Sequence, residues 1–137
     1  MIVADTGAVI ALVDSGDNHH GILRSLFEED PSRWVLPWAI LPEIDYLLSE
    51  HRGSSVEVEF VRDLAEGRWN VDWGVPADMD RACELCEKYS ALQLGLADAL
   101  VMATAERLHA QAIATLDLRD FGAVKILGEP ELWPRDA

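Results

Sequence analysis

The segment IVADTGAV (residues 2–9) decides the fold, because it joins a short apolar strand directly to a helix. Its first three residues form the kind of uninterrupted apolar run that is typical of a strand buried on both faces. Asp5 and Thr6 follow, and both residue types cap helices well, so a helix is expected as far as Leu12. This unit predicts an α/β protein and places Asp5 at the carboxyl end of the first strand.

The rest of the chain continues the alternation of strands and helices. Further strands are expected at residues 34–36, 69–73, 113–115 and 124–127, and helices at about 19–29, 38–50, 54–66, 76–88 and 97–110. Ser54 and Glu57 have the spacing of a capping box. The tail, residues 128–137, carries two prolines and is expected to be irregular. The pattern predicts a three-layer α/β/α sandwich around a mostly parallel five-stranded sheet.

The length and composition predict a single domain spanning residues 1–137. No apolar run approaches the ~20 residues that would span a bilayer, so no membrane segment is expected. The N-terminus lacks the pattern of a signal peptide, which makes a cytoplasmic location the expectation. Cys83 and Cys86 form a CxxC pair, but zinc needs further ligands that the chain does not supply, so packing is the favoured role.

Four carboxylates stand at the ends of separate apolar segments: Asp5, Glu43, Asp98 and Asp117. Oxygen ligands without His or Cys favour hard cations such as Mg²⁺ or Mn²⁺. Two carboxylates about 4 Å apart repel by roughly 4 kcal/mol at an effective dielectric near 20, so a cluster needs a counter-cation. One or two bound ions can activate water and stabilise the leaving oxygen of a phosphodiester. The pattern therefore predicts a metal-dependent nuclease.

Each carboxylate also has an ordinary alternative role. Asp5 and Asp98 stand where residues cap helices, and Asp117 stands where aspartate often forms a turn. The metal hypothesis depends on the joint placement of the four residues.

Two choices between neighbouring carboxylates are left open by the sequence. Asp45 competes with Glu43 for the position that faces the site, and Asp120 competes with Asp117 for the metal.

The net charge of −14 argues against tight autonomous binding to RNA, because nucleic-acid binders use Lys and Arg to neutralise phosphates. A bound cation would cancel part of this charge locally. The same acidity favours a basic protein partner. The alternative function is therefore a non-catalytic interaction module that binds such a partner through its acidic pocket.

Four segments carry a resemblance to a known family: DTGAVIALVDSGDNHH (5–20), PEIDYLL (42–48), LGLADALVMATAERL (94–108) and ATLDLRDFGAVKIL (114–127). In this order and spacing, the chain resembles a PIN domain, most closely the toxin ribonucleases of VapBC toxin-antitoxin systems. By this resemblance, Asp5, Glu43, Asp98 and Asp117 fall on the family's four acidic positions, which bind metal and carry catalysis. Thr6 and Thr115 fall on positions that orient carboxylates or water.

The resemblance also implies an activity and partners. It implies Mg²⁺- or Mn²⁺-dependent endoribonuclease activity on an RNA substrate, frequent homodimerisation, and neutralisation by a cognate antitoxin protein. The wide excess of acid in this chain departs from a favourable RNA-binding surface.

Overall fold

Five parallel strands form the central sheet of the computed structural model, which describes residues 1–137. The strands lie in the order β3-β2-β1-β4-β5. Their bounds are β1 (Ile2–Ala4), β2 (Trp34–Pro37), β3 (Val71–Asp72), β4 (Ala112–Ala114) and β5 (Glu131–Trp133). In the central strand, Val3 pairs with Val35 on one side and with Ile113 on the other. The predicted parallel five-stranded sheet is confirmed.

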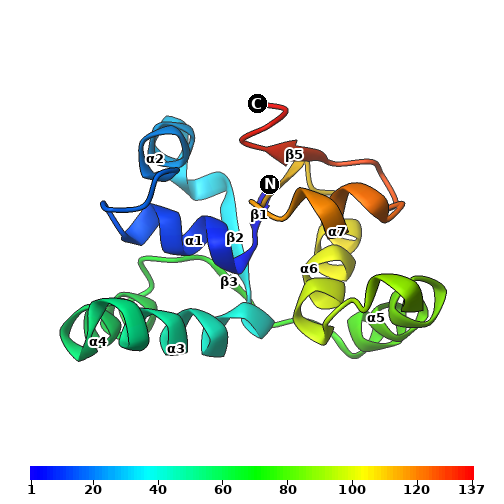
Figure 1. Ribbon diagram of the computed structural model, residues 1–137, viewed down its shortest axis with the longest axis horizontal. Helices are drawn as coiled ribbons and strands as arrows, with labels where there is room; N and C mark the ends of the chain where they lie inside the picture. Colours follow the sequence, from blue (N-terminus) through cyan, green and yellow to red (C-terminus); the bar gives the residue numbers. More distant parts are fainter.

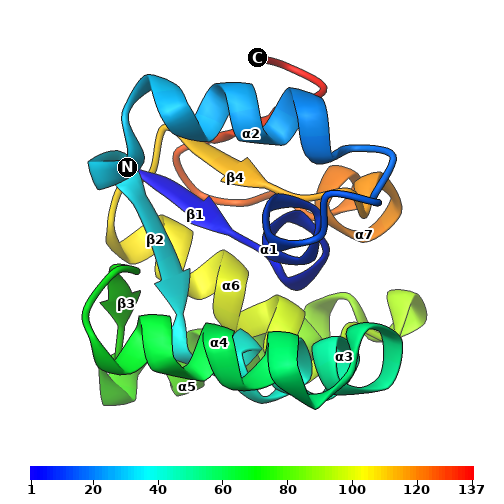
Figure 2. The ribbon, with the colours of Figure 1, turned by 90° about the vertical axis from the view of Figure 1, so that its left-hand side faces the viewer.

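Helices cover both faces of this sheet, as the edge-on view shows (Figure 1). One layer contains α1 (Thr6–Val13), α2 (His20–Glu29), α3 (Leu41–Arg52) and α4 (Ser54–Ala65). The other contains α5 (Pro76–Lys88), α6 (Leu96–Arg107) and α7 (Leu118–Ala123). In the turned view, α2, α3 and α4 lie in front of the strands and α6 lies behind them (Figure 2). Short 3-10 helices span Pro31–Arg33, Trp38–Ile40 and Ser90–Leu92.

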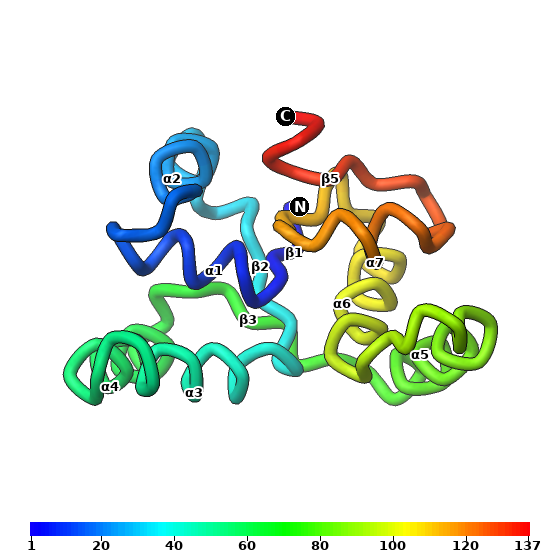
Figure 3. The backbone as a smooth tube through the Cα atoms, viewed as in Figure 1, coloured from blue at the N-terminus to red at the C-terminus, as the bar shows by residue number.

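The chain fills the two helical layers one after the other. The tube in Figure 3 runs through α1–α4 first and crosses to the α5–α7 side after β3. Within the layers, α1 packs against α2 and α3, and α5 packs against α6. None of the helices is long and apolar enough to cross a membrane.

The expected fifth strand at residues 124–127 is wrong. Val124 and Ile126 are buried there, but the backbone pairs with no strand, and the edge strand is instead Glu131–Trp133 beside Ala112–Ala114. Pro130 and Pro134 lie just outside the three paired residues, where proline removes no hydrogen bond from the ladder. The expectation of an irregular tail is therefore also wrong.

The expected capping box at Ser54 and Glu57 is wrong as well. Ser54 is the first residue of α4, and the N-cap is Gly53, with φ of +87° and no side-chain cap bond. Gly53 ends α3 and begins α4, so the turn between the two helices needs a left-handed residue where a capping serine would stand. The neighbouring Asp45 raises the pKa of the Glu57 carboxyl above its usual value.

Aromatic side chains fill one end of the core. Trp34 and Trp133 are buried, with ring centroids 6.4 Å apart, and Phe27 lies 5.5 Å from Trp34 in an edge-to-face contact. Trp73 lies outside this cluster, with 74% of its surface exposed.

Candidate metal centre

Five acidic side chains stand at the amino ends of helices. Asp5 is the N-cap of α1 and Asp117 is the N-cap of α7. Glu43, Asp98 and Asp120 lie in the first turns of α3, α6 and α7. Because the exposed N–H groups of a helix N-terminus favour negative charge, these four helices support carboxylates that would otherwise only repel one another.

Asp5 is held in one orientation by two hydrogen bonds. Its Oδ1 accepts from the Thr6 backbone N–H at 2.8 Å, and its Oδ2 accepts from the Thr115 hydroxyl at 3.0 Å. The side chain is buried, with 7% of its surface exposed. Burial raises the pKa of Asp5 above its usual value, although both hydrogen bonds act to lower it. Asp5 is therefore a helix cap, and the charges of Glu43 and Asp117 also raise its pKa.

Thr115 links the first carboxylate to the end of β4. Its hydroxyl donates to Asp5 and accepts the backbone N–H of Asp117 at 3.1 Å. The side chain is fully buried, so this geometry is fixed by the core. Thr6, by contrast, touches the Asp5 carboxylate through its backbone N–H.

Three carboxylates come together closely enough to share one ion. Oxygen atoms of Asp98, Asp117 and Asp120 all lie within 4.8 Å of one another. The Asp117 Oδ1 also accepts the backbone N–H of Asp120 at 3.1 Å, which places the two side chains on the same turn of α7. The structure therefore brings Asp117 and Asp120 together where the sequence left a choice between them.

The inclusion of Asp120 depends on α7, which the sequence analysis did not predict. The available signal was the spacing of three residues between Asp117 and Asp120, which puts both on one side of a helical turn. Asp98 lies in the same cluster but does not cap its helix, because α6 begins at Leu96 with Gly95 as the N-cap.

Burial and four neighbouring carboxylates raise the pKa of Asp98 to about 7, with burial the largest cause. The charges that contribute are those of Asp5, Asp117, Asp120 and Glu43. Glu43 is exposed, yet its charge also raises the pKa of Asp5. Asp45 instead raises the pKa of Glu57 on α4. Of the two rivals on α3, Glu43 is the one whose charge acts on the cluster.

A divalent cation fits these residues. None of the five carboxylates forms an ion pair with Lys, Arg or His. The Asp120 Oδ1 is buried and has no hydrogen-bond partner, a costly state for a carboxylate oxygen unless something positive meets it. The donor set consists of oxygen atoms alone, which suits Mg²⁺ or Mn²⁺.

Magnesium is expected to stabilise the protein more at high pH than at low pH. Because the pKa of Asp98 is raised from 3.8 to about 7, the folded protein binds more protons than the unfolded chain between these values. The contribution of Asp98 to metal-free stability is thus present at low pH and is lost as pH rises towards 7. An ion must displace this proton, so its apparent affinity should weaken about tenfold for each pH unit below 7.

Thermal melting with and without MgCl₂ at about pH 5.5 and about pH 8 measures this difference. The gain in melting temperature should be larger at the higher pH, and Asp98→Asn should remove the contrast. An equal gain at both pH values in the unsubstituted protein would contradict the assignment of Asp98 to the ion.

Known proteins share this sequence and fold. A family model described as the PIN domain matches residues 2–127. Ribonuclease VapC26 of Mycobacterium tuberculosis is 28% identical over 127 residues, which cover 93% of this chain and 94% of that protein. The crystal structure of VapC20 from the same organism, a toxin that cleaves the sarcin-ricin loop, superposes with a TM-score of 0.80 at 21% identity, covering 93% of this chain and 98% of that one.

A chain of a solved toxin-antitoxin complex has the same fold. DNA-bound VapBC from Salmonella typhimurium matches with a TM-score of 0.72 at 17% identity, covering 96% of this chain and 95% of that chain. The alternation of strands and helices read from the sequence is therefore the architecture of these solved structures.

Proposed function

Because this chain belongs to the PIN-domain family, we propose that it is a metal-dependent endoribonuclease that acts as the toxin of a toxin-antitoxin pair. The observation that carries the proposal is the cluster of Asp98, Asp117 and Asp120, whose oxygens lie within 4.8 Å of one another with no cationic side chain paired to them. The similarity to ribonuclease VapC26 supports RNA as the substrate.

Each residue has a part in this proposal. Asp98, Asp117 and Asp120 would hold Mg²⁺ or Mn²⁺, and Asp5 and Glu43 would add negative charge directly or through water. When bound, such an ion activates water and stabilises the leaving oxygen of a phosphodiester. Thr115 fixes the positions of Asp5 and Asp117 relative to each other, because its hydroxyl forms a hydrogen bond with each of them.

The proposal includes two protein partners and a location. A basic segment of a cognate antitoxin would form ion pairs with the five carboxylates, which have none within this chain. The similarity to a VapBC complex supports an antitoxin as the binding partner. A homodimer is supported by the exposed apolar groove that Trp38, Trp73, Val75 and Met79 line. The chain would act in the cytoplasm as one domain.

A non-catalytic interaction module is the second candidate, and the net charge of −14 favours it. Such a module needs only negative charge at its surface. The buried, unpartnered oxygen of Asp120 is better explained by an ion than by a surface contact. Metal-dependent catalysis is therefore the function that the site supports best.

Cleavage of RNA by the purified chain tests the proposal. A mixed pool of structured RNA, together with a hairpin carrying the sarcin-ricin loop, is incubated with MgCl₂, with MnCl₂ or with EDTA. Cuts at defined positions are expected with either ion and none with EDTA. If the folded protein binds Mn²⁺ but cuts nothing, the interaction module becomes the better description.

A further inference from the structure

The few cationic side chains of this acidic protein fall into two groups. Of the eleven Lys and Arg residues, six are in ion pairs with carboxylates. The remaining five have no carboxylate within ion-pair distance: Arg33, Arg62, Lys88, Arg119 and Lys125. Cations that are already neutralised release few counterions on meeting a phosphate, so only the second group can contribute fully to RNA binding.

One of these five lies on an element that builds the acidic centre, and two more lie on neighbouring segments of the same helical layer. Arg119 is in the first turn of α7, between Asp117 and Asp120 in the sequence, and is exposed. Lys125 lies two residues beyond the end of α7, and Lys88 is the last residue of α5. Both lysines are also exposed. Three of the five free cations are therefore exposed on the α5–α7 side of the sheet.

Tyr89 contacts both lysines. The Lys88 Nζ lies 5.5 Å from the centre of the Tyr89 ring, and the Tyr89 hydroxyl accepts the backbone N–H of Lys125 at 3.0 Å. The chain then continues from Tyr89 through the Ser90–Leu92 turn to α6, whose first turn carries Asp98. The lysine pair thus borders the loop that leads into the acidic centre.

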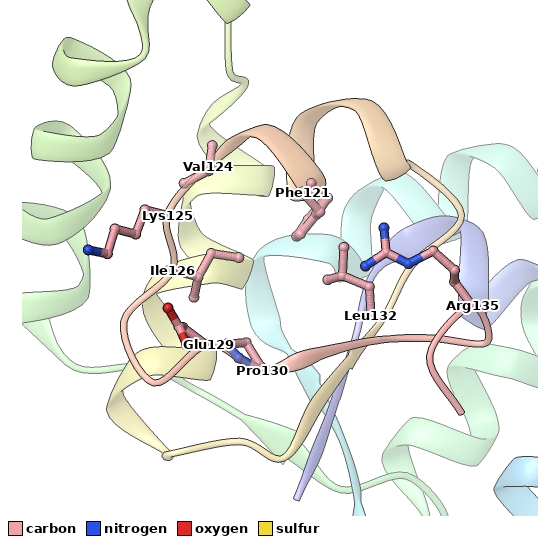
Figure 4. Close-up of a pocket in the computed structure, with 9 residues that line it drawn as sticks. Phe121, Val124, Lys125, Ile126, Glu129, Pro130, Leu132 and Arg135 are labelled. Carbon is pink, nitrogen blue, oxygen red and sulfur yellow. The ribbon is translucent and has the colours of Figure 1, made fainter.

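The pocket beneath α7 separates Lys125 from another basic residue. Figure 4 shows Lys125 extending away from the pocket side chains and towards α5, whereas Arg135 stands on the opposite side. Arg135 is bonded to Asp136 at 2.7 and 2.9 Å, so its charge is already compensated. Lys125 has no such partner and extends towards α5, the helix that ends at Lys88.

We infer that Lys88, Arg119 and Lys125 form a phosphate-binding surface that guides the RNA backbone into the acidic centre. This inference rests on the proposed nuclease function. A chain with a net charge of −14 repels RNA over most of its surface, so productive encounters need a local region of free positive charge.

RNA binding by two matched double variants tests the inference. Lys88→Gln/Lys125→Gln removes two free charges from the proposed surface. Arg33→Gln/Arg62→Gln removes two free charges elsewhere, because Arg33 lies at the amino end of β2 and Arg62 lies on α4 in the other helical layer. Both changes are made in an Asp98→Asn background to prevent cutting, and binding of a fluorescein-labelled sarcin-ricin hairpin in MgCl₂ is followed by anisotropy over a range of KCl concentrations.

The lysine variant is expected to bind the hairpin about tenfold more weakly. A plot of the logarithm of its binding constant against the logarithm of the salt concentration should have a slope that is shallower by roughly 1.4, or about 0.7 for each lost phosphate contact. The arginine variant should retain both values. Equal losses in the two variants, unchanged binding in the lysine variant, or no hairpin binding by the parent protein would overturn the inference.

The same proteins with Asp98 restored separate the two proposals. Wild-type cleavage that the lysine substitutions leave unchanged would overturn the phosphate-binding surface but leave the nuclease standing. Absence of wild-type cleavage, combined with RNA binding that depends on the two lysines, would overturn the nuclease but leave the surface. If both hold, the lysine variant should show a raised KM with kcat within about twofold, because uniform binding is what it loses.

Discussion

Asp98→Asn is expected to lower metal-dependent RNA cleavage by on the order of 10³-fold while leaving the protein folded. The substitution keeps the shape of the side chain and removes one negative charge. Two unit charges about 4 Å apart interact by roughly 4 kcal/mol at an effective dielectric near 20, which sets the scale of the loss. Since each 1.36 kcal/mol corresponds to a factor of ten in rate, the loss amounts to about three orders of magnitude.

Stability should move in the opposite direction from activity in this variant. The Asp98 pKa is raised to about 7 because burial and four carboxylates oppose its charge. An uncharged amide relieves that repulsion, so the melting temperature in EDTA should be equal to or higher than that of the wild type. A destabilised, inactive variant would not support a role for Asp98 at the ion, because lost activity would then follow from lost structure.

Asp80→Asn is the matched control for this measurement. Asp80 is an exposed aspartate on α5 that forms no ion pair. The same chemical change there should leave the cleavage rate unaltered. If the wild type and Asp80→Asn cut while Asp98→Asn does not, a contaminating ribonuclease is excluded, since all three proteins pass through the same purification.

Most of the fold could be read from the sequence because its strands are short apolar runs between helices. Residues 2–4, 34–36 and 113–115 each overlap a strand of the sheet, and residues 69–73 contain β3. The edge strand was missed for a physical reason. Val124 and Ile126 are apolar because they fill the core, which gives them the alternation of a strand without any pairing. Leu132 and Trp133, between two prolines, carry the pairing instead.

The sequence predicts that the acidic residues lie together at the carboxyl ends of the strands, but it does not predict how their side chains are arranged. Parallel strands bring their carboxyl ends to one edge, so the proximity of Asp5 to Asp117 follows from the order of β1 and β4. The contribution of Asp120 required α7, a helix of only six residues whose apolar pattern is too short to detect. The exposure of Glu43 also depends on how α3 packs, which one sequence does not determine.

Asp120→Asn is expected to weaken Mn²⁺ binding and to reduce cleavage by on the order of 10²-fold at low metal concentration, with partial recovery at high concentration. The Asp120 Oδ1 has no hydrogen-bond partner within the protein, so its charge is left free to hold an ion. Loss of a carboxylate that serves only the ion should leave the melting temperature in EDTA unchanged or raised. Calorimetric titration with Mn²⁺ measures the affinity for the ion. Cleavage rates measured over a range of metal concentrations show the loss of activity and its recovery.

Variants of Asp117 are the comparison for Asp120→Asn, because the Asp117 carboxylate has two roles. Its Oδ1 caps α7 through the Asp120 backbone N–H, and its oxygens also lie in the acidic cluster. Asparagine caps helices about as well as aspartate, whereas alanine costs about 1 kcal/mol. Asp117→Asn should therefore lose metal affinity alone, and Asp117→Ala should lose affinity and stability. If Asp120→Asn cuts RNA with the wild-type dependence on metal while Asp117→Asn does not, Asp98 and Asp117 hold the ion without Asp120.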